Sequence, residues 1–140
     1  MNVSFIFTEE GGRVSEIGKR LQEVERRIEA ARGRSPYGQD VILVAVTKFH
    51  PLENMEEVLR LGVTQVGENR VQEMEEKHDR LTLPAVWHLQ GHLQRNKVKK
   101  AVALADLIQS VDSAGILKEI DKRAEQAGKK QDLSLIHISE

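Results

Sequence analysis

Residues 41–48 read Val41-Ile42-Leu43-Val44-Ala45-Val46-Thr47-Lys48, an uncharged run that ends in a lysine. The run is mostly β-branched and has no polar alternation, which is typical of a strand that is buried on both faces. Such strands form parallel sheets that are covered by helices. The run therefore predicts a buried parallel strand over residues 41–47, with Lys48 at its carboxyl end.

The rest of the chain repeats this unit of strand and helix. Apolar residues at helical spacing predict helices over residues 14–31, 52–61, 70–81, 93–105 and 113–127. Apolar and β-branched runs predict further strands over residues 64–69, 85–91, 107–111 and 133–138. This regular alternation indicates an α/β fold of consecutive right-handed βαβ units. Both an open doubly wound sheet and an eight-stranded barrel use such units, and the chain is shorter than the roughly 200 residues that close such a barrel.

Composition places the chain among globular proteins with the size of one domain. It has 140 residues, 39% of them hydrophobic and 31% charged, and a formal net charge of −1. Near-neutral charge gives no electrostatic case for a nucleic-acid partner, and no apolar run reaches the length of a membrane span. The absence of cysteine excludes disulfides and thiolate metal sites, and the acidic start lacks a secretory signal. We therefore expect a cytoplasmic protein with no nucleic-acid or membrane partner.

Two polar residues stand at the carboxyl ends of predicted strands, the edge where parallel α/β folds build ligand sites. Lys48 is one, and a partly desolvated amine there is nucleophilic enough for a Schiff base. Its alternative role is that of a solvated strand end. Asn69 is the other, and its amide could hydrogen-bond a ligand or, alternatively, cap the following helix.

The segment from Trp87 to His92 holds His88 and His92 at i, i+4, a spacing that zinc sites use on helices. Because the glutamate of the zinc motif is missing and Gly91 interrupts a helix, we expect no metal site. His88 is instead expected to point into the mouth of a barrel.

Other polar groups have structural interpretations. The cations between Arg95 and Lys100 are expected to form a solvated helix face, compensated by acidic residues of the preceding helix. Asp112 or Ser113 is expected to cap the helix that follows residue 111. The sequence contains no glycine-rich phosphate loop, and no arrangement of residues indicates a catalytic triad.

Four segments, in this order and at this spacing, resemble the pyridoxal phosphate homeostasis protein family: Val44-Ala45-Val46-Thr47-Lys48, Gly67-Glu68-Asn69-Arg70-Val71-Gln72-Glu73, Trp87 to Lys97, and Ser110-Val111-Asp112-Ser113. The resemblance covers residues 13–132. It implies the N-terminal part of a (β/α)8 TIM-type barrel, similar to the N-terminal barrel of alanine racemase, with about five parallel strands. It also implies that pyridoxal 5′-phosphate (PLP) is held as a Schiff base on Lys48, with Asn69 and His88 beside it.

The resemblance further implies a role in vitamin B6 cofactor homeostasis, with no catalytic residue and no reaction of the protein's own. The implied partners are PLP and apo forms of PLP enzymes, and the full-length form is expected to be a monomer. The alternative is the N-terminal part of a fold-type-III PLP enzyme, an amino-acid racemase or decarboxylase. Such an enzyme takes a catalytic tyrosine from a second domain, whereas the one tyrosine here, Tyr37, precedes the first strand.

The chain departs from the family in two places. The family's phosphate-binding residues come from late strands that this sequence does not contain, and residues 133–140 differ from the family's usual strand and resemble a translated sequencing adapter. We therefore expect residues 1–140 to form a single partial PLP-binding domain with an incomplete barrel.

Overall fold

A computed structural model describes residues 15–136 of the chain. The chain divides into two compact units, residues 1–39 and residues 40–140. In the first unit, helix α1 (Glu16–Arg34) begins after Ser15, whose hydroxyl accepts a hydrogen bond of 3.0 Å from the amide of Gly18. The helix predicted over residues 14–31 is confirmed from Glu16 onward, while Val14 lies outside the described residues.

The second unit alternates strands and helices as predicted. Its elements are β1 (Val44–Val46), α2 (Leu52–Arg60), β2 (Gln65–Glu68), α3 (Val71–Arg80), β3 (Val86–Leu89), the 3₁₀ turn η1 (Arg95–Lys97), α4 (Val98–Leu104), β4 (Leu107–Val111), α5 (Ala114–Gln126) and β5 (Asp132–Leu135). Ser113 caps α5 by accepting a hydrogen bond from the amide of Ile116, as expected. His137 and Ile138, the end of the last predicted strand, lie outside the described residues.

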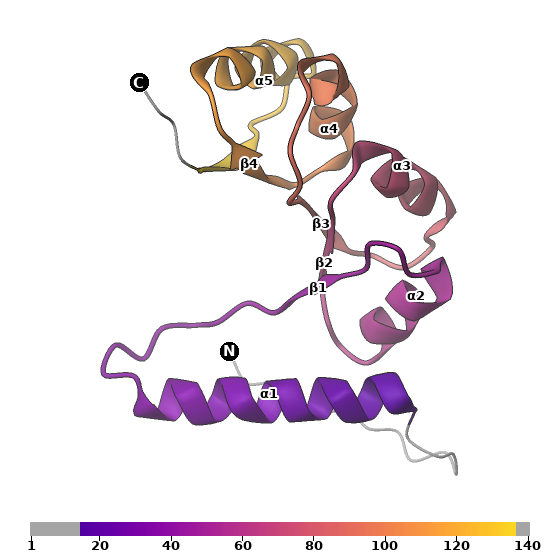
Figure 1. The fold of residues 1–140 in the computed structure, drawn as a ribbon, viewed down its shortest axis with the longest axis vertical. Coiled ribbons are helices and arrows are strands. Elements are labelled where there is room, and N and C mark those ends of the chain that lie inside the picture. Colours follow the sequence, from indigo (N-terminus) through magenta and orange to yellow (C-terminus); the bar gives the residue numbers. More distant parts are fainter. Residues whose placement is uncertain (1–14, 137–140) are drawn as a thin grey trace. The chain divides into compact units, whose positions relative to one another are not determined.

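All neighbouring strands pair in parallel, and the sheet order β1-β2-β3-β4-β5 follows the chain. Helices α2 to α5 lie along one side of this sheet (Figure 1). A doubly wound sheet would reverse its order once and carry helices on both faces. The sequential order with helices on one face is instead the arrangement of a (β/α)8 barrel, of which this chain forms the N-terminal part. Within the described residues the sheet does not close, so β1 and β5 are its edges.

The expectation that residues 41–47 form a strand buried on both faces is wrong, because none of residues 41–46 is buried and Val46, within the strand, is 43% exposed. Only Val44–Val46 pair as a strand, and Val41 and Ile42 are 50% and 62% exposed. The physical reason is that, within the described residues, β1 pairs with one strand, β2, so its other edge has no strand beside it. Composition predicts the tendency to be buried, but a neighbouring element has to provide the burial.

The hydrophobic core lies between the sheet and helices α2 to α5. It is built from alternate strand residues and the inner stripes of the helices, including Met55, Val66, Met74, Trp87, Leu89, Val98, Val102, Ile108, Val111 and Ile120. In β3 the core residues Trp87 and Leu89 alternate with His88, which therefore faces away from the helices. Within residues 15–136, no helix is both long and apolar enough to cross a membrane.

Candidate functional site

Lys48 and Asn69 are brought to the same edge of the sheet. They follow the neighbouring strands β1 and β2, and the register pairs Val46 with Gly67, the residues two positions before each. Lys48 is exposed, and its ammonium group makes no hydrogen bond or ion pair with any residue between 15 and 136. The carboxyl edge of the sheet therefore presents a lysine whose amine is available to a ligand.

The alternative role of Asn69, as a helix cap, is not realised. The N-cap position of α3 is Arg70, and no side chain hydrogen-bonds the first turn of that helix. Within the described residues the Asn69 side chain has no hydrogen-bond partner, and the residue is only partly exposed. An amide at a strand end with no protein partner is available to a bound molecule.

A buried ion pair holds these two strand ends against α3. The Lys77 ammonium donates to Glu68 Oε1 at 2.6 Å and to the carbonyl oxygen of Thr47 at 2.7 Å. The Thr47 hydroxyl donates to the same Oε1 at 2.5 Å, and Glu68 is fully buried. Since Thr47 precedes Lys48 and Glu68 precedes Asn69, this network fixes the backbone directly before both candidate residues.

Sequence reasoning missed this network, although a signal for it exists. In α3 the buried stripe contains Val71 and Met74, and Lys77 occupies the next position of the same stripe. A charged residue on an apolar stripe needs a buried partner of opposite charge. Glu68 meets that need because it shares the helix-facing side of β2 with Val66.

His88 lies on the other face of the sheet, where its imidazole links two neighbouring strands. Its Nε2 lies 2.6 Å from Gln65 Oε1 on β2, and its Nδ1 lies 2.8 Å from the amide nitrogen of Gln109 on β4. Donation from Nε2 and acceptance at Nδ1 describe a neutral ring with both nitrogens satisfied. His88 pairs with Gly67 in the register, so it lies about two residues, or roughly 7 Å, below the level of Lys48 and Asn69.

The two histidines that invite a metal interpretation do not converge. His92 Nδ1 lies 3.1 Å from Asp112 Oδ2, whereas His88 is bonded to the two glutamines. Within the described part of the chain, no group of three or more potential metal ligands gathers. In the basic segment after them, Lys100 pairs with Glu75 of α3 at 2.7 Å, one of the acidic residues expected to compensate it.

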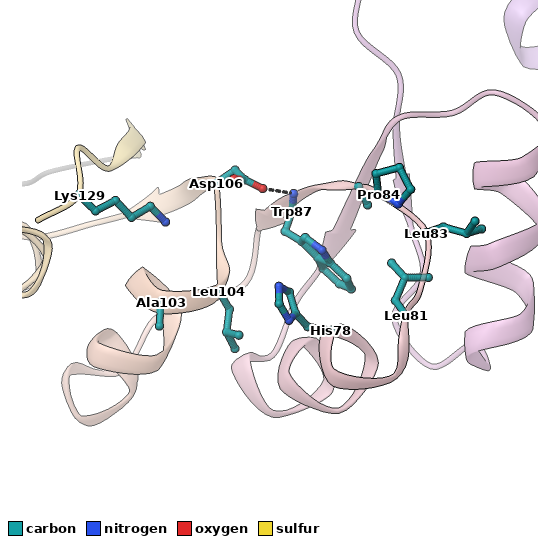
Figure 2. Close-up of a pocket in the computed structure, with 10 residues that line it drawn as sticks. His78, Leu81, Leu83, Pro84, Trp87, Ala103, Leu104, Asp106 and Lys129 are labelled. Carbon is teal, nitrogen blue, oxygen red and sulfur yellow. Dashed lines mark hydrogen bonds between the residues drawn. The ribbon is translucent and has the colours of Figure 1, made fainter. Parts of the chain in front are cut away.

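A hollow in the described structure lies at the opposite end of the strands (Figure 2). It has a volume of about 350 Å³ and is lined by residues that precede β3 and β4 and that end the helices, among them Leu81, Pro84, Trp87, Leu104, Asp106 and Lys129. Asp106 accepts a 2.7 Å hydrogen bond from the Trp87 amide there, and the Lys129 ammonium is bonded to two carbonyls at the end of α4. Lys48, Asn69 and His88 do not line it. In barrels of this kind the amino ends of the strands serve stability rather than binding.

The state of His88 predicts a pH dependence of stability. Burial lowers the pKa of His88 below its usual value, against an opposing effect of the Asp106 charge. The unfolded chain then takes up a proton at a higher pH than the folded chain does, so acidification favours unfolding. We expect stability to fall as the pH drops below the ordinary histidine pKa, and to level off below the lowered pKa.

Urea unfolding followed by Trp87 fluorescence between pH 5 and 8 measures this effect. The replacement His88→Gln should flatten the profile in that range, because it removes the buried titrating group and keeps a polar side chain. An equally steep profile in the variant would show that other groups cause the pH dependence.

Comparison with proteins of known sequence and structure identifies relatives of this chain. No family model matches the chain. Its sequence is 39% identical over 108 residues to the pyridoxal phosphate homeostasis protein of Aquifex aeolicus, covering 76% of this chain and 47% of that protein. The human protein of the same name is 30% identical over 130 residues, covering 86% of this chain and 47% of that protein.

Two solved structures are similar to this chain in both fold and sequence. PipY of Synechococcus elongatus, determined with PLP bound, has 35% identity and a TM-score of 0.66, covering 79% of this chain and 52% of that one. A protein of unknown function from Bifidobacterium adolescentis has 30% identity and a TM-score of 0.72, covering 84% of this chain and 53% of that one. The chain thus spans about half the length of the relatives it matches. Over that half, it belongs to the pyridoxal phosphate homeostasis protein family.

Proposed function

We propose that this chain holds PLP at the carboxyl edge of its sheet, as a Schiff base on Lys48, and serves vitamin B6 cofactor homeostasis without a reaction of its own. The observation that carries the proposal is the place of Lys48, which is exposed at the end of β1 and has no partner within residues 15–136. The solved relative with PLP bound and the name shared by the curated relatives support the choice of cofactor.

The residues at this edge fit an aldehyde cofactor. An unprotonated Lys48 Nζ attacks the aldehyde carbon, a C=N bond forms, and the aldehyde oxygen leaves as water. The Asn69 amide has no protein partner in the described structure and is free to hydrogen-bond a polar group on the ring. Both ring nitrogens of His88 are already hydrogen-bonded to glutamines. His88 would therefore contact the cofactor through the face and edge of its imidazole ring.

The same geometry supports a carrier rather than an enzyme. Chemistry on an amino acid needs an acid or base beyond the lysine that holds the cofactor. In the described part of the site, Lys77 is committed to Glu68 and Thr47, and His88 is committed to two glutamines. Neither of these two buried side chains is therefore available to move a substrate proton.

The proposal also covers the partners of the protein and its location in the cell. A carrier of this kind would pass PLP to apo-enzymes, act as a monomer in its full-length form and reside in the cytoplasm. A cytoplasmic location fits the absence of cysteine from the sequence.

A titration of the chain with PLP tests the proposal. Formation of the Schiff base should produce a new absorbance band near the border of the visible and ultraviolet ranges. The variant Lys48→Ala should lose this band, with at least a tenfold weaker apparent affinity. Lys99→Ala is the matched control, because Lys99 is an exposed lysine of α4 without a partner among the described residues, and it should bind like the wild type. An undiminished band in Lys48→Ala would refute the proposal.

A further inference from the structure

The turn that carries Lys48 is attached to α3 at three points. The first is the buried bond from Lys77 to the carbonyl oxygen of Thr47. At the second, the amide of Phe49 donates a 3.2 Å hydrogen bond to Glu73 Oε2. At the third, the guanidinium carbon of Arg70 lies 5.7 Å from the centre of the Phe49 ring, within the range of a cation–π contact. These attachments come from one face of α3, since Glu73 and Lys77 are four positions apart.

The backbone of this turn is strained. Phe49 has a φ of 61°, in the left-handed region that residues with a side chain seldom adopt. Such a conformation is unfavourable for a residue with a side chain and persists only where the surroundings hold it. The amide of His50 closes the turn by donating to the Thr47 carbonyl at 3.0 Å, and the Phe49 amide is held by Glu73.

We propose that Glu73 is a positioning residue for Lys48, an inference that rests on the proposed function. By accepting the Phe49 hydrogen bond it holds the strained turn in place. Because Lys48 lies in this turn, the geometry of the turn sets the direction of the Lys48 side chain. Lys48 would reach the aldehyde without Glu73, but from a broader range of directions, and its reaction would be slower.

Glu73 is suited to this role because the fold does not require it. Unlike Lys77 it is not buried in the core, and its hydrogen bond to Phe49 lies at the exposed surface. Lys77 bonds the carbonyl at the end of β1, whereas Glu73 bonds the amide of Phe49 in the turn beyond it. Removal of its carboxylate should therefore affect the reactivity of Lys48 much more than the stability of the chain.

The test compares the rate constant for the reaction of PLP with Lys48 in three variants of α3. Glu73→Ala should lower it on the order of tenfold, in keeping with the sensitivity of reactions to small misplacements. Glu73→Gln should keep most of the rate, because its amide oxygen can accept the same hydrogen bond. Glu76→Ala, which removes an exposed carboxylate of the same helix without a partner in the described structure, should leave the rate unchanged.

Two further measurements make the outcome decisive. Amide hydrogen exchange should show that Phe49 is protected in the wild type and in Glu73→Gln but not in Glu73→Ala. Unfolding followed by Trp87 fluorescence should give similar midpoints for all the variants. If the wild type reacts at Lys48 and Glu73→Ala reacts equally fast, this inference is overturned while the proposed function stands. If Lys48 of the wild type does not react, the proposed function fails and the inference fails with it.

Discussion

Replacement of Lys77 by methionine is expected to destabilise the chain by about 3–5 kcal/mol, the usual cost of leaving a buried charge without its partner. Glu68 is fully buried, and its Oε2 already has no hydrogen-bond partner in the described structure. Without Lys77, the carboxylate would keep only the hydroxyl of Thr47. Urea unfolding monitored by the fluorescence of Trp87, the single tryptophan and a buried one, measures the loss.

A second lysine provides the matched control. Lys100 forms an ion pair of 2.7 Å with Glu75, but its side chain is 54% exposed, whereas that of Lys77 is 11% exposed. Lys100→Met should therefore cost less than about 1 kcal/mol. The double variant Glu68→Leu with Lys77→Met should recover much of the lost stability, since it removes both charges together. Equal losses in Lys77→Met and Lys100→Met would show that the Glu68–Lys77 pair does not hold the strand ends.

Substitution of Gly91 by alanine is expected to have the other large effect. A Cβ atom there would lie 2.1 Å from the carbonyl oxygen of Asn69 and 2.9 Å from its carbonyl carbon. Backbone cannot rotate away as a side chain can, and the ends of β2 and β3 are tied by the bond from the Gln90 amide to the carbonyl of Glu68 at 2.9 Å. The two strand ends must separate, at a cost of about 3 kcal/mol or more.

Gly115 is the control for Gly91→Ala. It lies in the first turn of α5, and a Cβ there would meet nothing within 4 Å. Gly115→Ala should be neutral or slightly stabilising, because alanine favours a helix more than glycine does. We expect Gly91→Ala also to weaken PLP binding by displacing Asn69. A variant as stable as the wild type would mean that the strand ends at Asn69 and Gly91 do not approach so closely.

The order and type of the elements could be predicted from the sequence because each has a strong local pattern. The alternation of apolar runs with amphipathic stretches predicts consecutive βα units, and the position of Lys48 after its run places it at the ligand-binding edge. The exposure of Val41 and Ile42 could not be predicted, since it depends on which strand lies beside β1.

The polar contacts of the site could not be predicted from the sequence, for a different reason. The partners Thr47 and Lys77 are 30 residues apart, and Gln65 and His88 are 23 residues apart. Such pairs depend on the register between strands and on the rotation of a helix, which residue patterns do not fix. The strained conformation of Phe49 is equally hidden, because phenylalanine gives no local signal for a positive φ.

Chemical mapping of the PLP attachment tests the central claim most directly. The chain is incubated with PLP, the Schiff base is reduced with borohydride, and the labelled peptide is identified by mass spectrometry. Lysines 97 and 99 of the basic segment serve as internal references for unselective labelling. The account predicts that the label is found on Lys48 at low PLP concentration, before other lysines react. Labelling of Lys97 or Lys99 in preference to Lys48 would contradict it.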